Sequence, residues 1–146
     1  GSQIGCIKYA CIGNRSKQRV ESIELGQEME VHVAFTVPEG ADRDHLSVSF
    51  SIKDLKGTDL IVASTYELDA KHFQNQVNRY EVVYRFRNPL VTGKYVLVGA
   101  VEDRSSPTIH YYEYIEGTHY FTSSSREQMF GLFHPDIEQR IIARHE

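Results

Sequence analysis

Tryptophan is absent from this 146-residue sequence, and cysteine is scarce, with only Cys6 and Cys11. In one extended strand these two residues would lie about 16 Å apart, at about 3.3 Å per residue, which is too far for a disulfide bond. A chain of this length forms a substantial hydrophobic core without disulfides or metals. Two cysteines without a disulfide framework are typical of a reducing compartment, and we therefore expect a cytoplasmic protein.

The sequence also lacks a basic excess and a long apolar run. Its 16 Lys and Arg against 20 Asp and Glu give a formal net charge of −4, whereas nucleic-acid sites need a basic patch. The basic cluster at residues 15–19 lies beside a glycine turn, and we interpret it as a solvated loop. No segment approaches the length that spans a bilayer or has the pattern of a signal peptide. The opening Gly1-Ser2 is typical of the remnant of a cleaved expression tag, so we expect the natural chain to extend further in the N-terminal direction.

Common catalytic and metal-binding motifs are missing as well. Gly93-Lys94 lacks the other residues of a Walker phosphate loop, and the serine-hydrolase and zinc-protease signatures are absent. The histidines are scattered, and Asp42–Asp44 offers too few carboxylates for a calcium loop. We therefore expect no metal and no cofactor.

Carboxylate pairs for glycoside hydrolysis can be drawn, Glu113 with Glu116 or with Asp103, but no feature singles them out. A glycan-cleaving enzyme is thus a distant alternative.

The feature that dominates the sequence is alternation with a period of two, interrupted by turn signals. Met29, Val31, Val33, Phe35 and Val37 occupy every second position, which predicts a half-buried strand. Similar patterns predict further strands at residues 46–53, 59–65, 80–87, 94–103 and 109–122. The strand at 94–103 has apolar residues on both faces, which is typical of a central strand.

About seven strands at this spacing, with no convincing internal helix, predict an all-β fold, an antiparallel β-sandwich. We assign residues 3–125 to this domain and residues 126–146 to a C-terminal segment that follows a Ser123–Ser125 hinge. Its apolar stretch, residues 128–133, needs a partner surface, and we expect it to be exchanged in a homodimer. The alternative is that it folds back on its own sheet. Residues 135–142 fit either a short helix or a further strand.

Tyrosine is the residue type in excess, with nine copies, four of them on the last predicted strand. In a regular strand His110, Tyr112 and Tyr114 share one face. The opposite face is more apolar and suits the core; it carries Ile109, Tyr111 and Ile115. Rings with polar tips suit a sugar, whose C–H faces stack on them and whose hydroxyls need fixed donors and acceptors.

These residues define a candidate ligand surface, with loop residues at one end and an arginine from a neighbouring strand. The predicted ligand-binding residues are His110, Tyr112, Tyr114, Asp103, Arg104, Arg85 and Arg87. A bulge near Gly117 would exchange the two faces and turn Tyr112 or Tyr114 inward. The tyrosines fit a second interpretation equally well, as core residues whose hydroxyls reach solvent at the sheet edge.

Several short motifs occur in a recognisable order. They are residues 25–28 (LGQE), 50–57 (FSIKDLKG), 93–103 (GKYVLVGAVED), 112–116 (YEYIE) and Tyr120-Phe121. In this order they resemble the C-terminal domain of the ATP-binding subunit of O-antigen polysaccharide ABC exporters, the Wzt type, over residues 7–132. Tyr114 stands where that family often has tryptophan, which keeps an aromatic ring at the position.

The resemblance implies an immunoglobulin-like β-sandwich that binds an O-antigen polysaccharide at the cytoplasmic face of the inner membrane, without catalysis. It also implies an ATPase domain ahead of this one, a membrane subunit of the exporter and a homodimer. We expect weak glycan binding through ring stacking and hydrogen bonds, without a divalent cation. The rival from another class is an immunoglobulin-like module that only dimerises or docks a protein partner.

Overall fold

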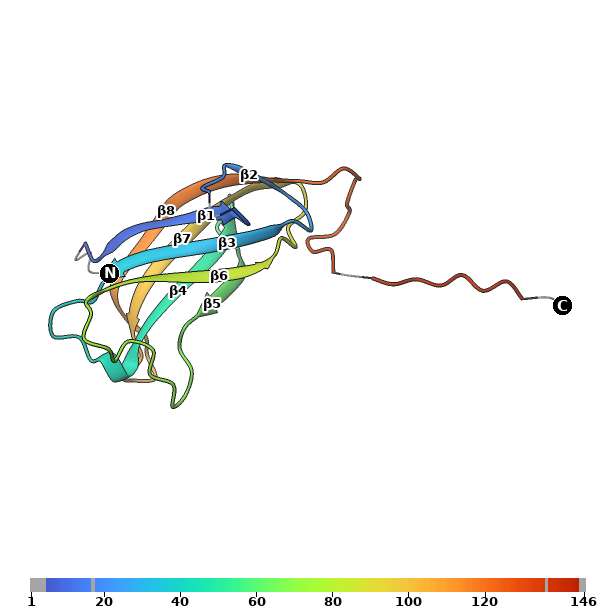
Figure 1. Cartoon of the computed structure of the whole chain (residues 1–146). Helices are drawn as coiled ribbons and strands as arrows, with labels where there is room; N and C mark the ends of the chain where they lie inside the picture. The colour runs from blue at the N-terminus through green and yellow to red at the C-terminus, as the bar shows by residue number, and fades with distance from the viewer. Residues whose placement is uncertain (1–4, 17, 136, 145–146) are drawn as a thin grey trace.

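Two β-sheets packed face to face make up the body of the protein (Figure 1). The structure is a computed structural model that describes residues 5–16, 18–135 and 137–144. Its elements are β1 (Ile7–Asn14), β2 (Ser22–Glu24), β3 (Glu28–Thr36), the 3-10 helix η1 (Arg43–His45), β4 (Leu46–Asp54), β5 (Asp59–Ser64), β6 (Arg79–Arg87), β7 (Gly93–Asp103) and β8 (His110–Ser124). One sheet has the strand order β1-β3-β6 and the other β2-β8-β7-β4-β5. Every pair is antiparallel except β2 with β8, so the predicted all-β sandwich is confirmed.

The period-two pattern of the sequence becomes the inner face of each sheet. The alternate residues of β3 from Met29 to Phe35 are at most 1% exposed. Opposite them, the ring of Phe50 on β4 packs against Tyr84 and Phe86 of β6, with centroids 4.8 and 6.0 Å away. The strand β7 pairs with β4 on one side and β8 on the other, as predicted for a central strand.

Two buried side chains of β8 bind the backbone at and beside the edge strand β1, across the seam where the edges of the two sheets meet. The carboxylate oxygens of Glu113 accept the backbone N–H groups of Gly5 and Ile7, both at 2.7 Å. Further along, Nδ1 of His119 accepts the N–H of Ile12 at 2.8 Å. Both residues are 2% exposed, and they satisfy the N–H groups of Ile7 and Ile12, which would otherwise be buried without a partner.

The contacts of His119 fix its neutral form. Because Nδ1 accepts the N–H of Ile12, the ring proton is on Nε2, which lies 3.1 Å from Oε2 of Glu21. A second proton on Nδ1 would face a donor. Burial lowers the pKa of His119, and the hydrogen bond with Glu21 opposes this only in part.

We therefore expect the domain to lose stability between pH 7.5 and 5.5. A folded-state pKa below the unfolded value, about 6.5, means that the unfolded chain binds the proton first. The stabilisation is present above that unfolded value and is lost as the pH falls from there through the lowered folded pKa. Urea unfolding at both pH values measures the loss. His119→Gln should remove most of it and His110→Gln should not; an unchanged pH difference in His119→Gln would contradict the assignment.

The C-terminal segment leaves the sandwich after β8 and runs away from it (Figure 1). In its described residues, 126–135 and 137–144, Phe133 forms an isolated bridge with Leu90, and neither a helix nor a longer strand is present. Both structures considered for residues 135–142 are therefore wrong for the described part of that range; residue 136 lies outside it.

Cys6 and Cys11 are free thiols, as the sequence predicts. Burial, with the nearby Glu113 carboxylate, raises the pKa of Cys6 to about 11. Within the described ranges, no helix has the length and apolar character needed to cross a membrane.

Candidate functional site

A β-bulge at Tyr112 decides which tyrosines face solvent. In the β7–β8 register Tyr111 pairs with Glu102, and Glu113 pairs with the residue before Glu102, so Tyr112 is the additional residue of the bulge. Tyr112 packs against the core, and Tyr111 lines an outer pocket together with Tyr114. The predicted shared face of Tyr112 and Tyr114 is therefore wrong, because one extra residue exchanges the two faces of the strand beyond it.

Of the other predicted residues at this end of the sheet, some lie at the outer pocket and some on the inner side of the sheet. Arg104 lines the pocket with Tyr114. His110 pairs with Asp103, which in turn pairs with the buried Leu46, so this row belongs to the inner side of the sheet. Oδ1 of Asp103 accepts the N–H of Ser105 at 2.9 Å and holds the β7–β8 turn.

The two predicted arginines of β6 lie in the other sheet. The strand β6 pairs with β3 and not with β8, so the prediction that Arg85 or Arg87 neighbours the tyrosines is wrong. Nη2 of Arg85 lies 2.8 Å from Oε2 of Glu30, a carboxylate only 1% exposed. Alternation within a strand shows which residues share a face, but it does not give the order of strands in a sheet.

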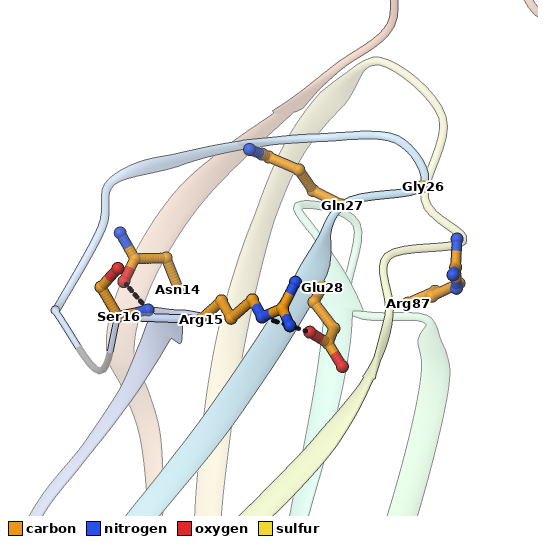
Figure 2. Close-up of a pocket in the computed structure, with 7 residues that line it drawn as sticks. All are labelled: Asn14, Arg15, Ser16, Gly26, Gln27, Glu28 and Arg87. Atoms are coloured by element: carbon orange, nitrogen blue, oxygen red, sulfur yellow. Dashed lines mark hydrogen bonds and ion pairs between the residues drawn. The ribbon is translucent and has the colours of Figure 1, made fainter.

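Arg87 lines a different hollow, at the end of the three-stranded sheet (Figure 2). Its lining is polar, formed by Asn14, Arg15, Ser16, Gly26, Gln27, Glu28 and Arg87. Nε of the exposed Arg15 lies 3.6 Å from Glu28. Among the described residues that line this hollow there is no aromatic ring, the flat apolar surface on which a sugar stacks.

The pocket with Tyr111 and Tyr114 lies on the outer face of the five-stranded sheet and has a volume of about 300 Å³. Small side chains create the depression, because Ser49 of β4 and Ala100 of β7 lie side by side in one row. The next residue of this row, Tyr114 of β8, forms one side of the depression. Val62 and Val98, which share an outward row with Ser51, and Ile109 add apolar groups to the lining. The outward serines of β4 are visible in the sequence as the polar half of its alternation, and they were the available signal for a hollow here.

A buried carboxylate forms the polar end of the pocket. Glu102 is 3% exposed and accepts hydrogen bonds from the Ser49 hydroxyl at 2.9 Å and from Nε of Arg104 at 3.0 Å. The Arg104 guanidinium also lies over the ring of Tyr66, 5.1 Å from its centroid. Arg104 is thus held between a carboxylate and a ring, with its donors in a fixed position.

The two tyrosines form the aromatic wall. Their rings meet edge to face with centroids 5.2 Å apart. Nζ of Lys53 donates to the Tyr114 hydroxyl at 3.2 Å and lies 3.6 Å from Glu116 and 4.0 Å from Asp59. The Tyr114 hydrogen bond is the main reason that the pKa of Lys53 is raised.

In the described residues, no three His, Cys, Asp or Glu side chains lie close enough together to hold a metal ion.

The buried Oγ of Ser47 has no hydrogen-bond partner, and it is the one buried side-chain polar atom of which this is true among the described residues. Ser47 belongs to the same row as Glu102 and Tyr111. Such atoms are uncommon in folded proteins.

The outer pocket combines an aromatic wall with a few fixed polar groups on an immunoglobulin-like sandwich, a combination that many ligand sites share. The family model of the Wzt C-terminal domain matches residues 1–135, and the chain belongs to this family, the non-catalytic carbohydrate-binding domain of O-antigen exporters.

Comparison of structures gives the same fold. The crystal structure of the C-terminal domain of Wzt superimposes with a TM-score of 0.75 over 98% of this chain and 87% of that one, at 12% identity. A short stretch of 60 residues is 40% identical to mitochondrial division protein 1 of Eremothecium gossypii. That stretch is 41% of this chain and only 8% of the mitochondrial division protein, so it shows no shared family.

Proposed function

We propose that the domain is a non-catalytic module that binds an O-antigen polysaccharide and brings it to its ABC exporter. The observation that carries the proposal is the outer pocket, where the Tyr111 and Tyr114 rings stand beside the Glu102–Arg104 pair. The family to which the chain belongs supports the choice of a glycan as the ligand.

The pocket supplies both kinds of contact that a sugar needs. The tyrosine rings offer apolar surface for the C–H face of a pyranose, and the carboxylate of Glu102 offers acceptors to hydroxyls. Arg104 adds donors in a fixed planar array. Because its partners already hold it in place, little side-chain entropy is lost on binding.

The geometry favours binding over cleavage. Both oxygens of Glu113 accept backbone N–H groups on the inner side of the sheet, away from the pocket. Glu116 is 69% exposed at its side chain, and Asp103 holds a turn. Hydrolysis needs two carboxyl groups that flank one bond, about 5–9.5 Å apart, and the pairs suggested by the sequence do not face a common cavity.

The test of this function is a titration of the isotope-labelled domain with the lipid-free O-polysaccharide of the organism that encodes it. Chemical-shift changes should concentrate at Tyr111, Tyr114 and Arg104, and they should be unaffected by EDTA. If no resonance shifted on adding the polysaccharide, the result would favour the rival, a dimerisation or protein-docking module. Loss of binding in EDTA, restored by calcium, would contradict binding without a divalent cation.

The place of action in this proposal is the cytoplasmic face of the inner membrane, next to the ATPase domain and membrane subunit of the exporter. A transporter with two copies of the module would raise a modest single-site affinity through avidity.

We also propose that the C-terminal segment joins two copies of the chain. Its side chains Phe130, Leu132 and Ile141 are 90%, 70% and 90% exposed, although apolar side chains of this size are normally covered. Beyond the Phe133–Leu90 bridge the segment runs away from its own sandwich (Figure 1), which leaves that part free to pair with the open sheet edge of a second copy.

We therefore expect the full chain to sediment as a dimer at micromolar concentration, and a chain that ends at Ser125 to sediment as a monomer. The shorter chain should keep its cooperative unfolding, because the sandwich strands end at Ser124. A full chain that is monomeric at high micromolar concentration would count decisively against exchange.

A further inference from the structure

A second pocket adjoins the first at the end of the sandwich opposite the C-terminal segment, where η1 and the β5–β6 connection lie (Figure 1). Its volume is about 220 Å³, and it is lined by Asp44, His45, Tyr66, Glu67, Leu68, Asp69, Ala70 and Lys71. We infer that this pocket is a second saccharide subsite, and that the two pockets together bind consecutive uncharged sugar units of one chain. The inference rests on the proposed glycan binding of the first pocket.

The two pockets share a wall with a fixed geometry. The backbone N–H of Arg104, which lines the first pocket, donates to the carbonyl oxygen of His45, which lines the second, at 2.9 Å. The Arg104 guanidinium lies over the ring of Tyr66, another residue of the second pocket. A ligand that crosses this wall passes from one pocket directly into the other.

The volumes favour a ligand that occupies both. Small-molecule sites usually measure about 300–1,000 Å³, so the first pocket, at about 300 Å³, is at the lower limit and the second, at about 220 Å³, is below it. Each alone would bury little of a polysaccharide. A chain that enters both gains a second set of contacts without a second loss of translational freedom.

The lining of the second pocket suits sugar hydroxyls and is held in place. Oδ1 of Asp44 accepts a hydrogen bond from Gln74 at 2.7 Å and lies 3.6 Å from Nζ of Lys71. His45 is held by Asp42 through a 2.6 Å contact. At the rim, Leu68 is 80% exposed and offers an apolar surface to the C–H groups of a pyranose.

Charge selects the class of sugar. The two pockets are lined by five carboxylates, on Asp44, Asp59, Glu67, Glu102 and Asp69, and by two permanent cations, Arg104 and Lys71. The cations are already engaged with Glu102 and Asp44. A phosphate, sulfate or uronate group would enter a negative field, so neutral units fit this surface best.

The experiment compares ligand lengths on variants of the intact chain. The probes are lipid-free O-polysaccharide fragments of one to four repeats, released by mild acid, with the dissociation constant measured by calorimetry. Ala70→Phe places a ring in the second pocket, and Gln76→Phe places the same ring on an exposed position of the same connection, outside both pockets. Thermal melting checks that each variant folds. If Ala70→Phe does not fold, Lys71→Ala replaces it as the variant that changes the second pocket.

We expect the wild type to bind long fragments at least about tenfold more tightly than the shortest one, a gain of about 1.4 kcal/mol, with little dependence on salt. Ala70→Phe should lose that gain and keep its affinity for the shortest fragment, while Gln76→Phe should behave as wild type. If Ala70→Phe bound long fragments as tightly as the wild type does, the proposed second subsite would be contradicted. Tighter binding of anionic fragments would overturn the charge assignment. Absence of binding by the wild type to every fragment would instead refute the proposed function itself.

Discussion

Glu113→Ala should lower the free energy of unfolding by about 2–3 kcal/mol, because it leaves the buried N–H of Ile7 without an acceptor and removes the bond to the more exposed Gly5. These donors, on Gly5 and Ile7, each bind one carboxylate oxygen at 2.7 Å. Buried donors that lose a charged acceptor are among the costly defects of a fold. Urea unfolding followed by circular dichroism measures the change.

Glu116→Ala is the matched control, since it removes the same side chain three residues away. The Glu116 carboxylate is 69% exposed and 3.6 Å from Lys53, and an exposed pair of this kind contributes at most about 1 kcal/mol. Glu113→Gln should fall between the two, because its amide keeps one acceptor oxygen and turns a donor toward the other N–H. Equal stability of the two alanine variants would show that Glu113 does not hold the seam.

The strands that alternate cleanly could be predicted from the sequence. The inward residues of β3 and β4 are buried where the period of two places them, and β7 is central as its two apolar faces indicate. The strands β1 and β2 could not be predicted in the same way. In β1 the inward and outward positions do not alternate in polarity, and β2 has three residues.

The candidate site was less predictable, because it depends on strand order and on one inserted residue. Tyr114 and Arg104 were placed at the pocket, whereas Tyr111, Glu102 and Ser49 were missed. A bulge was considered near Gly117, where φ is +70° and the register does shift. The bulge that exchanged the tyrosines, at Tyr112, has no glycine or proline to mark it.

The same bulge provides the sharpest test of the site. Tyr114→Ala should weaken binding of the lipid-free O-polysaccharide by about fivefold or more, equivalent to about 1 kcal/mol or more, with a small change in stability. Tyr111→Ala should do the same, because its ring forms the other half of the wall. Tyr112→Ala should instead lower stability by about 1–3 kcal/mol, since a partly buried ring is removed from the core, and leave binding close to wild type.

Tyr120→Ala is the control for an exposed tyrosine on the same strand. Its ring is 62% exposed and lies outside the pocket, so neither binding nor stability should change by more than about 0.5 kcal/mol. Calorimetric titration and thermal melting on all four variants separate the two effects. If Tyr112→Ala weakened binding while Tyr111→Ala and Tyr114→Ala did not, the glycan would bind on the inner side of the bulge, and the outer pocket would not be the site. If all three weakened binding equally without loss of stability, the bulge would not divide the tyrosines into a core residue and a binding pair.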